Sequence, residues 1–230
     1  MRPSGGSMFS RVAVTGGIGA GKSTITKHLQ ERGAFVIDYD EVSREIVAPG
    51  TDGLRRVVDL FGSEALNADG TMNRKWVSHE VFGRPDLRKR YESIIHPLIF
   101  ADAEKQESDW IASLEGRCEL SQGNGRSGHY CKPGSPHRIV IHEIPLLAET
   151  GIARWFDTVI DIEAPEEVRI QRLVESRNLN RAEARARIAS QASEEQRRQI
   201  ATYVINSDKP LQEVYDEVDR IYDKLCHLEG

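Results

Sequence analysis

A glycine-rich segment near the N-terminus has the residue types and the spacing of a phosphate-binding loop. Gly16 to Thr24 (GGIGAGKST) matches the pattern G-x-x-x-x-G-K-[ST]. Its glycines allow backbone conformations in which successive N–H groups converge on phosphate oxygens. Lys22 would bridge the β- and γ-phosphates of a nucleotide, and the Ser23 hydroxyl would bind Mg²⁺. The predicted nucleotide-binding residues are Gly17, Ile18, Gly19, Ala20, Gly21, Lys22, Ser23 and Thr24.

The elements around this segment favour the same interpretation. A short β-branched run, Arg11 to Thr15, predicts a buried strand, and a helix is expected from Ser23 to Arg32, ended by Gly33. The helix N-terminus would add its partial positive charge to the phosphate site. The alternative is a fortuitous glycine-rich turn, and the four fixed positions would match by chance in roughly one chain of this length in a hundred. The sequence therefore predicts nucleotide binding.

A carboxylate is expected near this loop. The run Ala34 to Ile37 predicts a second strand that ends at Asp38, at the carboxyl edge of the sheet where ligands of open α/β sheets bind. Asp38 is the candidate catalytic base, which would orient an attacking hydroxyl and take its proton late. Its alternative role is to cap the helix that follows, although Asp40 would be the better cap.

The remaining apolar runs indicate the fold class. Three further strands are predicted over Ile139 to Ile144, Thr158 to Ile162 and Tyr203 to Ile205. Together with the intervening helices they indicate an α/β, P-loop NTPase-like fold, a parallel sheet covered by helices on both faces. A last helix is expected over 211–225, and its apolar face would comprise Leu211, Val214, Val218, Ile221, Tyr222 and Leu225.

The chain is predicted to form a single domain, 8–230, with an inserted lobe and a lid. The nucleotide-binding core would comprise 8–50 and 138–230, and 51–114 would form the inserted helical substrate lobe. The segment 115–137, rich in Gly, Ser and Pro, predicts a flexible loop. The charged stretch 165–198 predicts one or two exposed helices that form a lid. The first seven residues are expected to be a disordered tail.

Composition limits the other roles. The 230 residues carry a formal net charge of -5, which gives no global attraction to nucleic acid or to an anionic membrane. No apolar run approaches the roughly 18 residues of a membrane span, and no secretory signal is visible, so the expected location is the cytoplasm. Nothing in the sequence indicates an oligomeric state.

The cysteines do not indicate a disulfide framework. Cys118, Cys131 and Cys226 are an odd and widely spaced set. A zinc site formed by Cys118, His129, Cys131 and His137 is an alternative, but these residues lack the close C-x-x-C pair usual in structural zinc sites. The sequence therefore favours free thiols over a metal centre.

The base-reading motif of GTPases, N-K-x-D, is absent, because 206–209 reads N-S-D-K. This absence argues against a regulatory GTPase, and the favoured class is an ATP-dependent small-molecule kinase. Two other functions stay open. The chain could phosphorylate a nucleoside or another metabolite, or it could be a regulatory protein that binds ATP without catalysis.

From Arg11 to Ile205 the chain resembles the dephospho-coenzyme A kinase family. The similar segments are Thr15 to Thr24, Val36 to Asp40, Arg44 to Val47 with Pro49-Gly50, Val81-Phe82, Ile95 to Pro97, and Glu143 to Leu147 with Glu149. This resemblance implies a phosphotransferase with an alcohol acceptor, which phosphorylates the ribose 3'-hydroxyl of dephospho-coenzyme A in the last step of coenzyme A synthesis. ATP would be the co-substrate and Mg²⁺ the cofactor.

The resemblance also implies roles for individual residues. Asp38 would serve the acceptor hydroxyl, and Arg44 and His96 would bind dephospho-coenzyme A beside the inserted lobe. Arg44 could instead be a solvated helix charge, and His96, before Pro97, could simply shape a helix junction. Glu143 could contact magnesium through water or accept from nearby backbone donors.

Arginines of the lid would neutralise the migrating phosphoryl charge. Arg172 lies where the resemblance places the first of them. At the position of the second stands Ser176, and Arg177 follows one place later, a rotation of about 100° on a helix. Arg177 is the candidate second arginine. Alternatively Arg177, Arg181 and Arg185 form a solvated stripe, which is the favoured interpretation for the last two.

Overall fold

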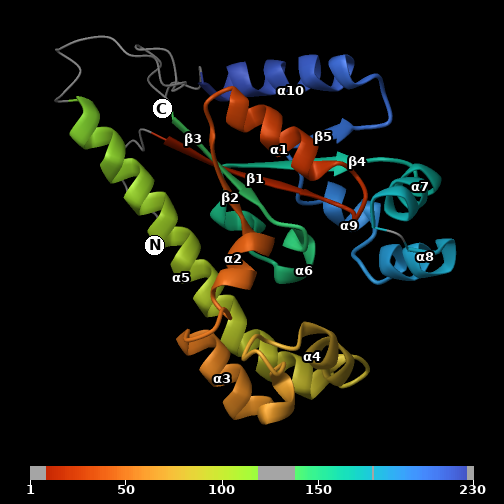
Figure 1. Cartoon of the computed structure of the whole chain (residues 1–230). Helices are drawn as coiled ribbons and strands as arrows, with labels where there is room; N and C mark the ends of the chain where they lie inside the picture. The colour runs from red at the N-terminus through yellow and green to blue at the C-terminus, as the bar shows by residue number, and fades with distance from the viewer. Residues whose placement is uncertain (1–8, 119–137, 178, 227–230) are drawn as a thin grey trace. The chain divides into compact units, whose positions relative to one another are not determined.

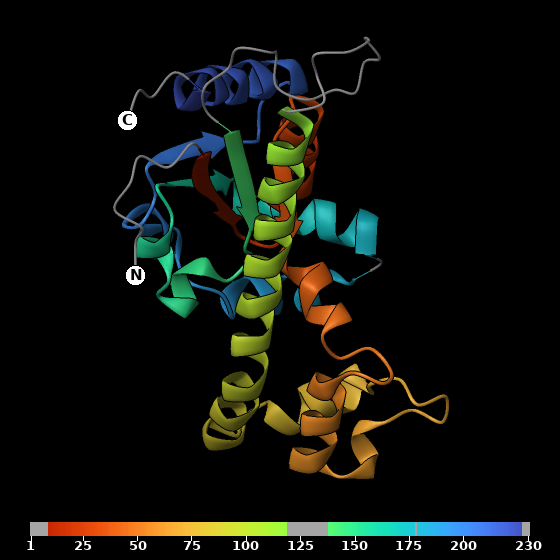
Figure 2. The same ribbon diagram turned by 90° about the vertical axis from the view of Figure 1, so that its left-hand side faces the viewer.

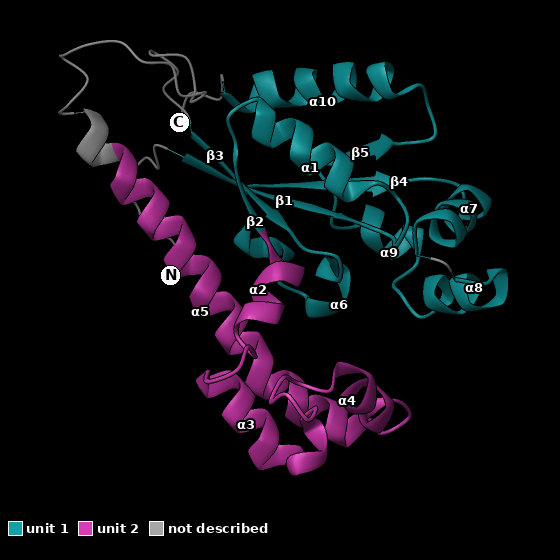
Figure 3. Ribbon diagram, in the orientation of Figure 1, with its two compact units in different colours: residues 1–37, 123–230 teal, residues 38–122 magenta. Residues whose placement is uncertain are grey.

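The computed structural model describes residues 9–118, 138–177 and 179–226 (Figure 1). The chain divides into two compact units, one formed by 1–37 with 123–230 and the other by 38–122 (Figure 3). Each unit has a hydrophobic core of its own. The second unit is inserted into the sequence of the first, and it already begins at Asp38, earlier than the lobe expected from residue 51.

A five-stranded sheet forms the first unit. Its strands are β1 (Phe9–Gly16), β2 (Phe35–Asp38), β3 (Arg138–Glu143), β4 (Thr158–Glu163) and β5 (Tyr203–Asn206), in the order β2-β3-β1-β4-β5. β1 pairs in parallel with both β3 and β4, and β4 pairs in parallel with β5. β1 is thus the central strand, and the glycine-rich loop leaves the middle of the sheet at its carboxyl end. The predicted strands are confirmed to within two residues at each end.

Helices cover both faces of the sheet, as predicted. α1 (Lys22–Glu31) and α10 (Leu211–Cys226) lie on one face, and α6 (Leu147–Thr150) and α9 (Glu194–Arg198) lie on the other (Figure 1). Alternate strand residues such as Val12 and Val14 bury their side chains against α1 and α10. The predicted apolar face of α10 is buried except for Leu211, which is 53% exposed because it precedes the turns that pack on the sheet.

The stretch predicted as one or two exposed lid helices forms three helices. They are α7 (Glu166–Arg177), α8 (Arg181–Ala189) and α9. A 3-10 turn, Ala153–Trp155, precedes β4 and is not part of this stretch. The stretch is not uniformly exposed, since the side chains of Arg169 and Arg197 are buried. The charge pattern alone could not separate these two arginines from their solvated neighbours.

The second unit is helical. α2 (Tyr39–Glu45), α3 (Asp52–Phe61) and α4 (Arg74–Val81) pack along α5 (Pro85–Cys118), and a 3-10 turn, Ser63–Ala65, follows α3 (Figure 2). The ring of Phe61 meets the rings of Trp76 and Tyr91 edge-on in the core of this unit. The Thr51 hydroxyl caps α3 by accepting from the Leu54 N–H at 3.2 Å.

Two predictions about this unit were wrong. Residues 115–118, which were expected in the flexible loop, are the last residues of α5. Pro97 lies inside α5, so His96 does not mark a helix junction. The rest of the predicted loop, 119–137, lies outside the described residues, as do the predicted N-terminal tail and the zinc candidates His129, Cys131 and His137. Among the helices that are described, none is both long and apolar enough to cross a membrane.

Candidate active site

The loop between β1 and α1 has the conformation that its glycines allow. Gly16 has φ 147°, and a Cβ at this position would lie 2.3 Å from the Ile162 carbonyl oxygen of the neighbouring strand. Gly21 has φ 95° and ψ 21°, in the left-handed region, and caps α1 without a side chain. No side chain therefore caps the first turn of α1, and Ser23 and Thr24 in that turn are exposed beside the loop.

Lys22 lies over the loop. Its Nζ donates to the carbonyl oxygens of Gly16 at 2.9 Å and Gly17 at 3.3 Å. The ammonium group, the N-terminal dipole of α1 and the N–H groups of the loop therefore act on the same small region. This combination can bind a polyphosphate.

Two side chains that the sequence did not identify bind Ile18. Its N–H donates to Gln191 Oε1 at 2.7 Å, and its carbonyl accepts from Arg169 Nε at 2.9 Å. Ile18 was predicted to bind the nucleotide, but its N–H is already bonded within the protein. These partners are 173 and 151 residues distant in the chain, and no local pattern connects them with the loop.

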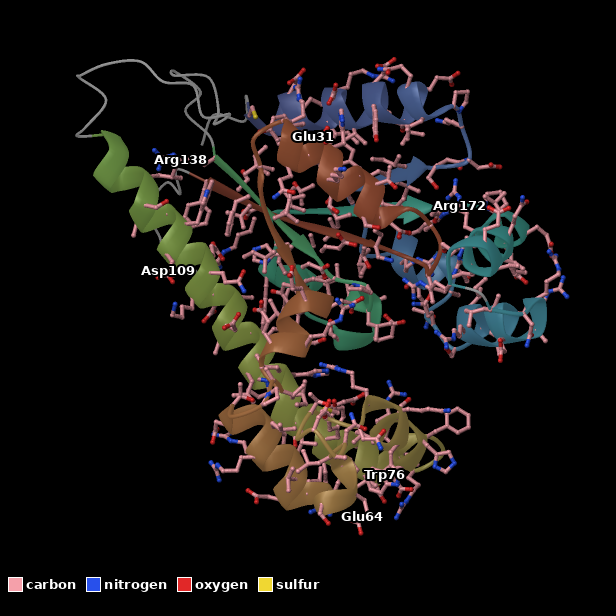
Figure 4. All side chains as sticks on the ribbon, viewed as in Figure 1. Glu31, Glu64, Trp76, Asp109, Arg138 and Arg172 are labelled. Carbon is pink, nitrogen blue, oxygen red and sulfur yellow. The ribbon has the colours of Figure 1, made fainter. Side chains whose placement is uncertain are left out.

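The structure brings Arg172 to the loop, where it was expected. It extends from α7 (Figure 4), and its Nη1 donates to Ser207 Oγ at 2.9 Å and to the carbonyls of Ala20 at 3.3 Å and Gly19 at 3.4 Å. Its Nη2 donates to the Ser207 carbonyl at 2.9 Å. Ser207 Oγ in turn donates to the Ala20 carbonyl at 2.6 Å. Arg172 thus connects the loop to the segment that follows β5.

Arg177 lies apart from this network. Its side chain is exposed at the end of α7. Arg177 is five residues after Arg172, so at about 100° per residue the two side chains point in directions about 140° apart around the helix. Arg181 and Arg185 both pair with Glu167 on the surface. The predicted solvated stripe is therefore confirmed for Arg181 and Arg185, and a catalytic role for Arg177 stays a prediction.

Asp38 caps a helix. Its Oδ1 accepts from the N–H groups of Asp40 at 2.8 Å and Glu41 at 3.3 Å, at the start of α2. The expectation that Asp40 would be the better cap was wrong. Asp38 has the extended backbone of an N-cap, φ -88° and ψ 110°, whereas Asp40 is already inside the helix. Both bonds use one oxygen, so capping does not decide whether the carboxylate also acts as a base.

A buried carboxylate lies beside α1. The Thr26 hydroxyl donates to Glu143 Oε2 at 2.6 Å, and Glu143, at the end of β3, is opposite Val14 of β1. Thr26 is three residues after Ser23 and lies on the same side of α1. This bond to Glu143 comes from a side-chain hydroxyl, a donor that the sequence had not suggested.

Two arginine–carboxylate pairs lie on the opposite face of the sheet from α1. Asp161 has no exposed surface, and its Oδ1 is 3.3 Å from Arg197 Nε. Burial raises the pKa of Asp161 to about 7, although Arg197 opposes the shift. Arg198 binds Glu163 through two bonds, of 2.8 and 2.6 Å, and holds the pKa of Glu163 below its ordinary value.

The predicted acceptor residues belong to the second unit. Arg44 is exposed in the last turn of α2. His96 is half-buried in α5, where its ring lies 6.1 Å from the ring of Phe100. The described residues contain no group of three or more His, Cys, Asp or Glu side chains that could hold a metal ion by themselves.

A parallel sheet whose central strand leads through a G-x-x-x-x-G-K-[ST] loop into a helix defines the P-loop class of nucleotide-binding phosphotransferases. The family model described as dephospho-CoA kinase matches residues 10–114 and 130–213. The chain belongs to the dephospho-CoA kinase family.

Similar proteins agree with this assignment. The dephospho-CoA kinase of Streptomyces avermitilis is 38% identical over 217 residues, which cover 94% of both chains. That of Bifidobacterium longum is 41% identical over 219 residues, 94% of this chain and 96% of the relative. Among solved structures, TT1252 from Thermus thermophilus is 27% identical with a TM-score of 0.71, and the match covers 96% of this chain and 99% of that one. The dephospho-CoA kinase from Campylobacter jejuni, 22% identical with a TM-score of 0.62 over 94% of this chain and 96% of its own, shares the fold.

Proposed function

We propose that this protein transfers the γ-phosphate of ATP to the ribose 3'-hydroxyl of dephospho-coenzyme A and so produces coenzyme A. The observation that carries the proposal is the match to the family model in both units, since residues 10–114 include most of the second unit and 130–213 include the lid helices. A P-loop alone would support only nucleotide binding.

The chain's own residues supply positioning and charge. In the transfer, a bond forms between the acceptor oxygen and the γ-phosphorus as the bond from that phosphorus to the β,γ-bridging oxygen breaks. The transition state is loose, so stabilisation of its oxygen charges matters more than strong base chemistry. Lys22 and the N-terminus of α1 would bind the β- and γ-phosphates, and Arg172, which contacts the loop, would add positive charge beside them.

Asp38 is proposed to take the proton of the acceptor hydroxyl. Its Oδ1 is used by the helix cap, which would fix the carboxylate and orient its other oxygen. Asp40 is its matched comparison, because it lies two residues later in the first turn of α2, whereas Asp38 is the N-cap. Asp38→Asn should lower turnover and leave ATP affinity unchanged. Equal activity of Asp38→Asn and wild type would show that Asp38 is not the base. A loss of turnover confined to Asp40→Asn would assign that role to Asp40.

The donors around the loop suit Mg²⁺, which prefers oxygen ligands and keeps several waters. Ser23 would bind the ion directly through its hydroxyl. Glu143, which accepts from Thr26 one turn after Ser23 on α1, would bind the ion through water. The bound ion would neutralise phosphate charge during transfer.

Arg44 and His96 are proposed to bind dephospho-coenzyme A, and Arg177 is proposed to approach the nucleotide when the lid closes. A reducing cytoplasm would suit the buried thiol of Cys226.

A coupled ADP-release assay tests the proposal. The protein would be incubated with ATP, Mg²⁺ and either dephospho-coenzyme A or a panel of nucleosides, shikimate and gluconate. We expect turnover only with dephospho-coenzyme A, and loss of nearly all of it in Lys22→Ala. ADP release with another acceptor would identify a different metabolite kinase, and ATP binding without transfer to any acceptor would identify a non-catalytic protein.

A further inference from the structure

Arg169, on α7, carries a buried charge that is only partly paired. Its side chain is 4% exposed, and its Nε donates to the Ile18 carbonyl at 2.9 Å. Its Nη2 has no hydrogen-bond partner within the residues that the structure describes. Buried polar groups are nearly always hydrogen-bonded, and a buried charged donor without a partner is especially unfavourable. The exception indicates a place where a ligand atom completes the bonding.

The unpaired nitrogen lies against the phosphate-binding loop. A Cβ on Gly17 would come within 2.3 Å of Arg169 Nη2 and 2.4 Å of the central guanidinium carbon, so the guanidinium occupies the space of a side chain at this position. The Gly17 carbonyl accepts from Lys22 Nζ at 3.3 Å. Two cations from different elements therefore contact the same glycine of the loop.

The nearby charges do not satisfy Arg169. Arg197 is paired with Asp161, and Arg169 itself makes no ion pair within the described ranges of the chain. Glu166 and Glu194 attract it without a hydrogen bond, and burial together with Arg197 lowers the pKa of Arg169. An anion would supply the missing counter-charge.

A cavity lies beside Arg169. Arg169 lines a cavity of about 840 Å³, which is bounded by the residues between α7 and α9, Gln191 and Arg197 among them. Gln191 also holds the Ile18 N–H, so the cavity wall and the loop are joined by hydrogen bonds.

The position of Arg169 on its helix fits this role. Arg169 and Arg172 are three residues apart and lie on the same side of α7, and both donate to carbonyls of the loop. Arg177 lies about 140° away around the helix from Arg172. Of the three, only Arg169 combines contact with the loop and an unpaired buried nitrogen.

We propose that Arg169 binds an oxygen of the terminal phosphate of ATP and is the second arginine of the phosphoryl-transfer site. The inference rests on the proposed function and names a further catalytic residue for it. Arg169 keeps its proton throughout. It adds positive charge as the bond from the γ-phosphorus to the bridging oxygen breaks and the bond to the acceptor oxygen forms.

Nucleotide affinity distinguishes this role from that of a brace for the loop. We would measure ATP and ADP binding by isothermal titration calorimetry for wild type, Arg169→Gln, Arg169→Lys and the matched exposed variant Arg187→Gln. Arg169→Gln should lose about tenfold in ATP affinity with ADP affinity unchanged, and about 10²-fold in kcat. Arg169→Lys should recover part of both, and Arg187→Gln should behave as wild type. Equal losses of ATP and ADP affinity would overturn the proposal in favour of a structural role.

Gly17→Ala gives a second test that leaves Arg169 in the chain. The φ of Gly17 is outside the left-handed region, so alanine fits its backbone, but the new Cβ must displace the guanidinium. Gly17→Ala should reproduce the selective loss of ATP affinity, and the double variant Gly17→Ala/Arg169→Gln should lose no more than either single variant. Additive losses would show that the two positions act separately and would overturn the proposal.

Arg177→Gln completes the comparison, because this residue is the rival candidate. A selective loss of ATP affinity and kcat in Arg177→Gln, with none in Arg169→Gln, would assign the role to Arg177 and overturn the inference. The ATP–ADP comparison needs no acceptor. If the difference in affinity appears but dephospho-coenzyme A is not phosphorylated, the proposed function fails and the assignment of Arg169 stands.

Discussion

The buried pair between Arg197 and Asp161 makes a quantitative prediction about stability and pH. Arg197→Met removes the counter-charge of a carboxylate that has no exposed surface and keeps most of the packing volume. It also removes the bond of 2.6 Å from Arg197 Nη1 to the Ala192 carbonyl. Loss of that hydrogen bond should cost about 1 kcal/mol at any pH. The electrostatic part depends on whether Asp161 is ionised.

The sign follows from the raised pKa of Asp161. Its ordinary value is 3.8 and burial raises it to about 7, so between these values the folded state holds a proton that the unfolded state has lost. The contribution of Asp161 to stability therefore declines as the pH rises from about 4 to about 7, and in the wild type it then becomes constant. In Arg197→Met the carboxylate loses its partner, its pKa rises further, and the decline continues above pH 7.

Each pH unit of continued decline corresponds to about 1.4 kcal/mol. Arg197→Met should therefore destabilise the protein by about 1 kcal/mol at pH 5 and by about 4 kcal/mol at pH 9, which agrees with the roughly 3–5 kcal/mol typical of breaking a buried pair. Urea unfolding followed by far-UV circular dichroism at both pH values gives the two differences directly. Arg197→Met/Asp161→Asn is the control and should lose the pH dependence. The same destabilisation at pH 5 and pH 9 would show that Arg197 does not alter the pKa of Asp161 and would refute the reasoning.

Two further substitutions, each with a control variant, test local packing beside the loop by urea unfolding. Thr26→Val removes the hydroxyl that donates to the buried carboxylate of Glu143 and should lower the free energy of unfolding by about 1–3 kcal/mol. Thr26→Ser keeps the hydroxyl and should be close to wild type. Equal stability of the Val and Ser variants would contradict the importance of this bond. Gly16→Ala places a Cβ 2.3 Å from the Ile162 carbonyl oxygen at a φ of 147° and should cost about 3 kcal/mol or more. Gly70→Ala, at φ 80° with open space around it, should cost only about 1 kcal/mol, and similar losses at the two glycines would argue against the steric explanation.

The sequence predicted the features that depend on neighbouring residues. The phosphate-binding loop is a contiguous motif, and each strand of the sheet is a short β-branched run, so both were located within two residues. The cap of α2 was misassigned because Asp38 and Asp40 are equally suitable by residue type. Only the backbone angles, extended at Asp38 and helical at Asp40, separate them.

The rest of the site depends on contacts between distant parts of the chain. Arg169 and Gln191 bind Ile18 across 151 and 173 residues, and nothing in the charged pattern of the lid distinguishes Arg169 from the exposed Arg177. Pro97 misled for a different reason. Its ring is exposed, so α5 accommodates the proline on its solvent side while Ile95 packs in the core.

The position of the second unit between neighbouring strands has a consequence for folding kinetics. β2 and β3 are adjacent in the sheet, yet the whole segment 38–122 lies between them in the chain. Pairing of these strands must close a long loop, which is entropically unfavourable and slows folding in proteins with distant contacts. Because the segment contains a hydrophobic core of its own, it can collapse early and shorten the effective loop. Substitutions in that core should then slow the assembly of a sheet that they do not touch.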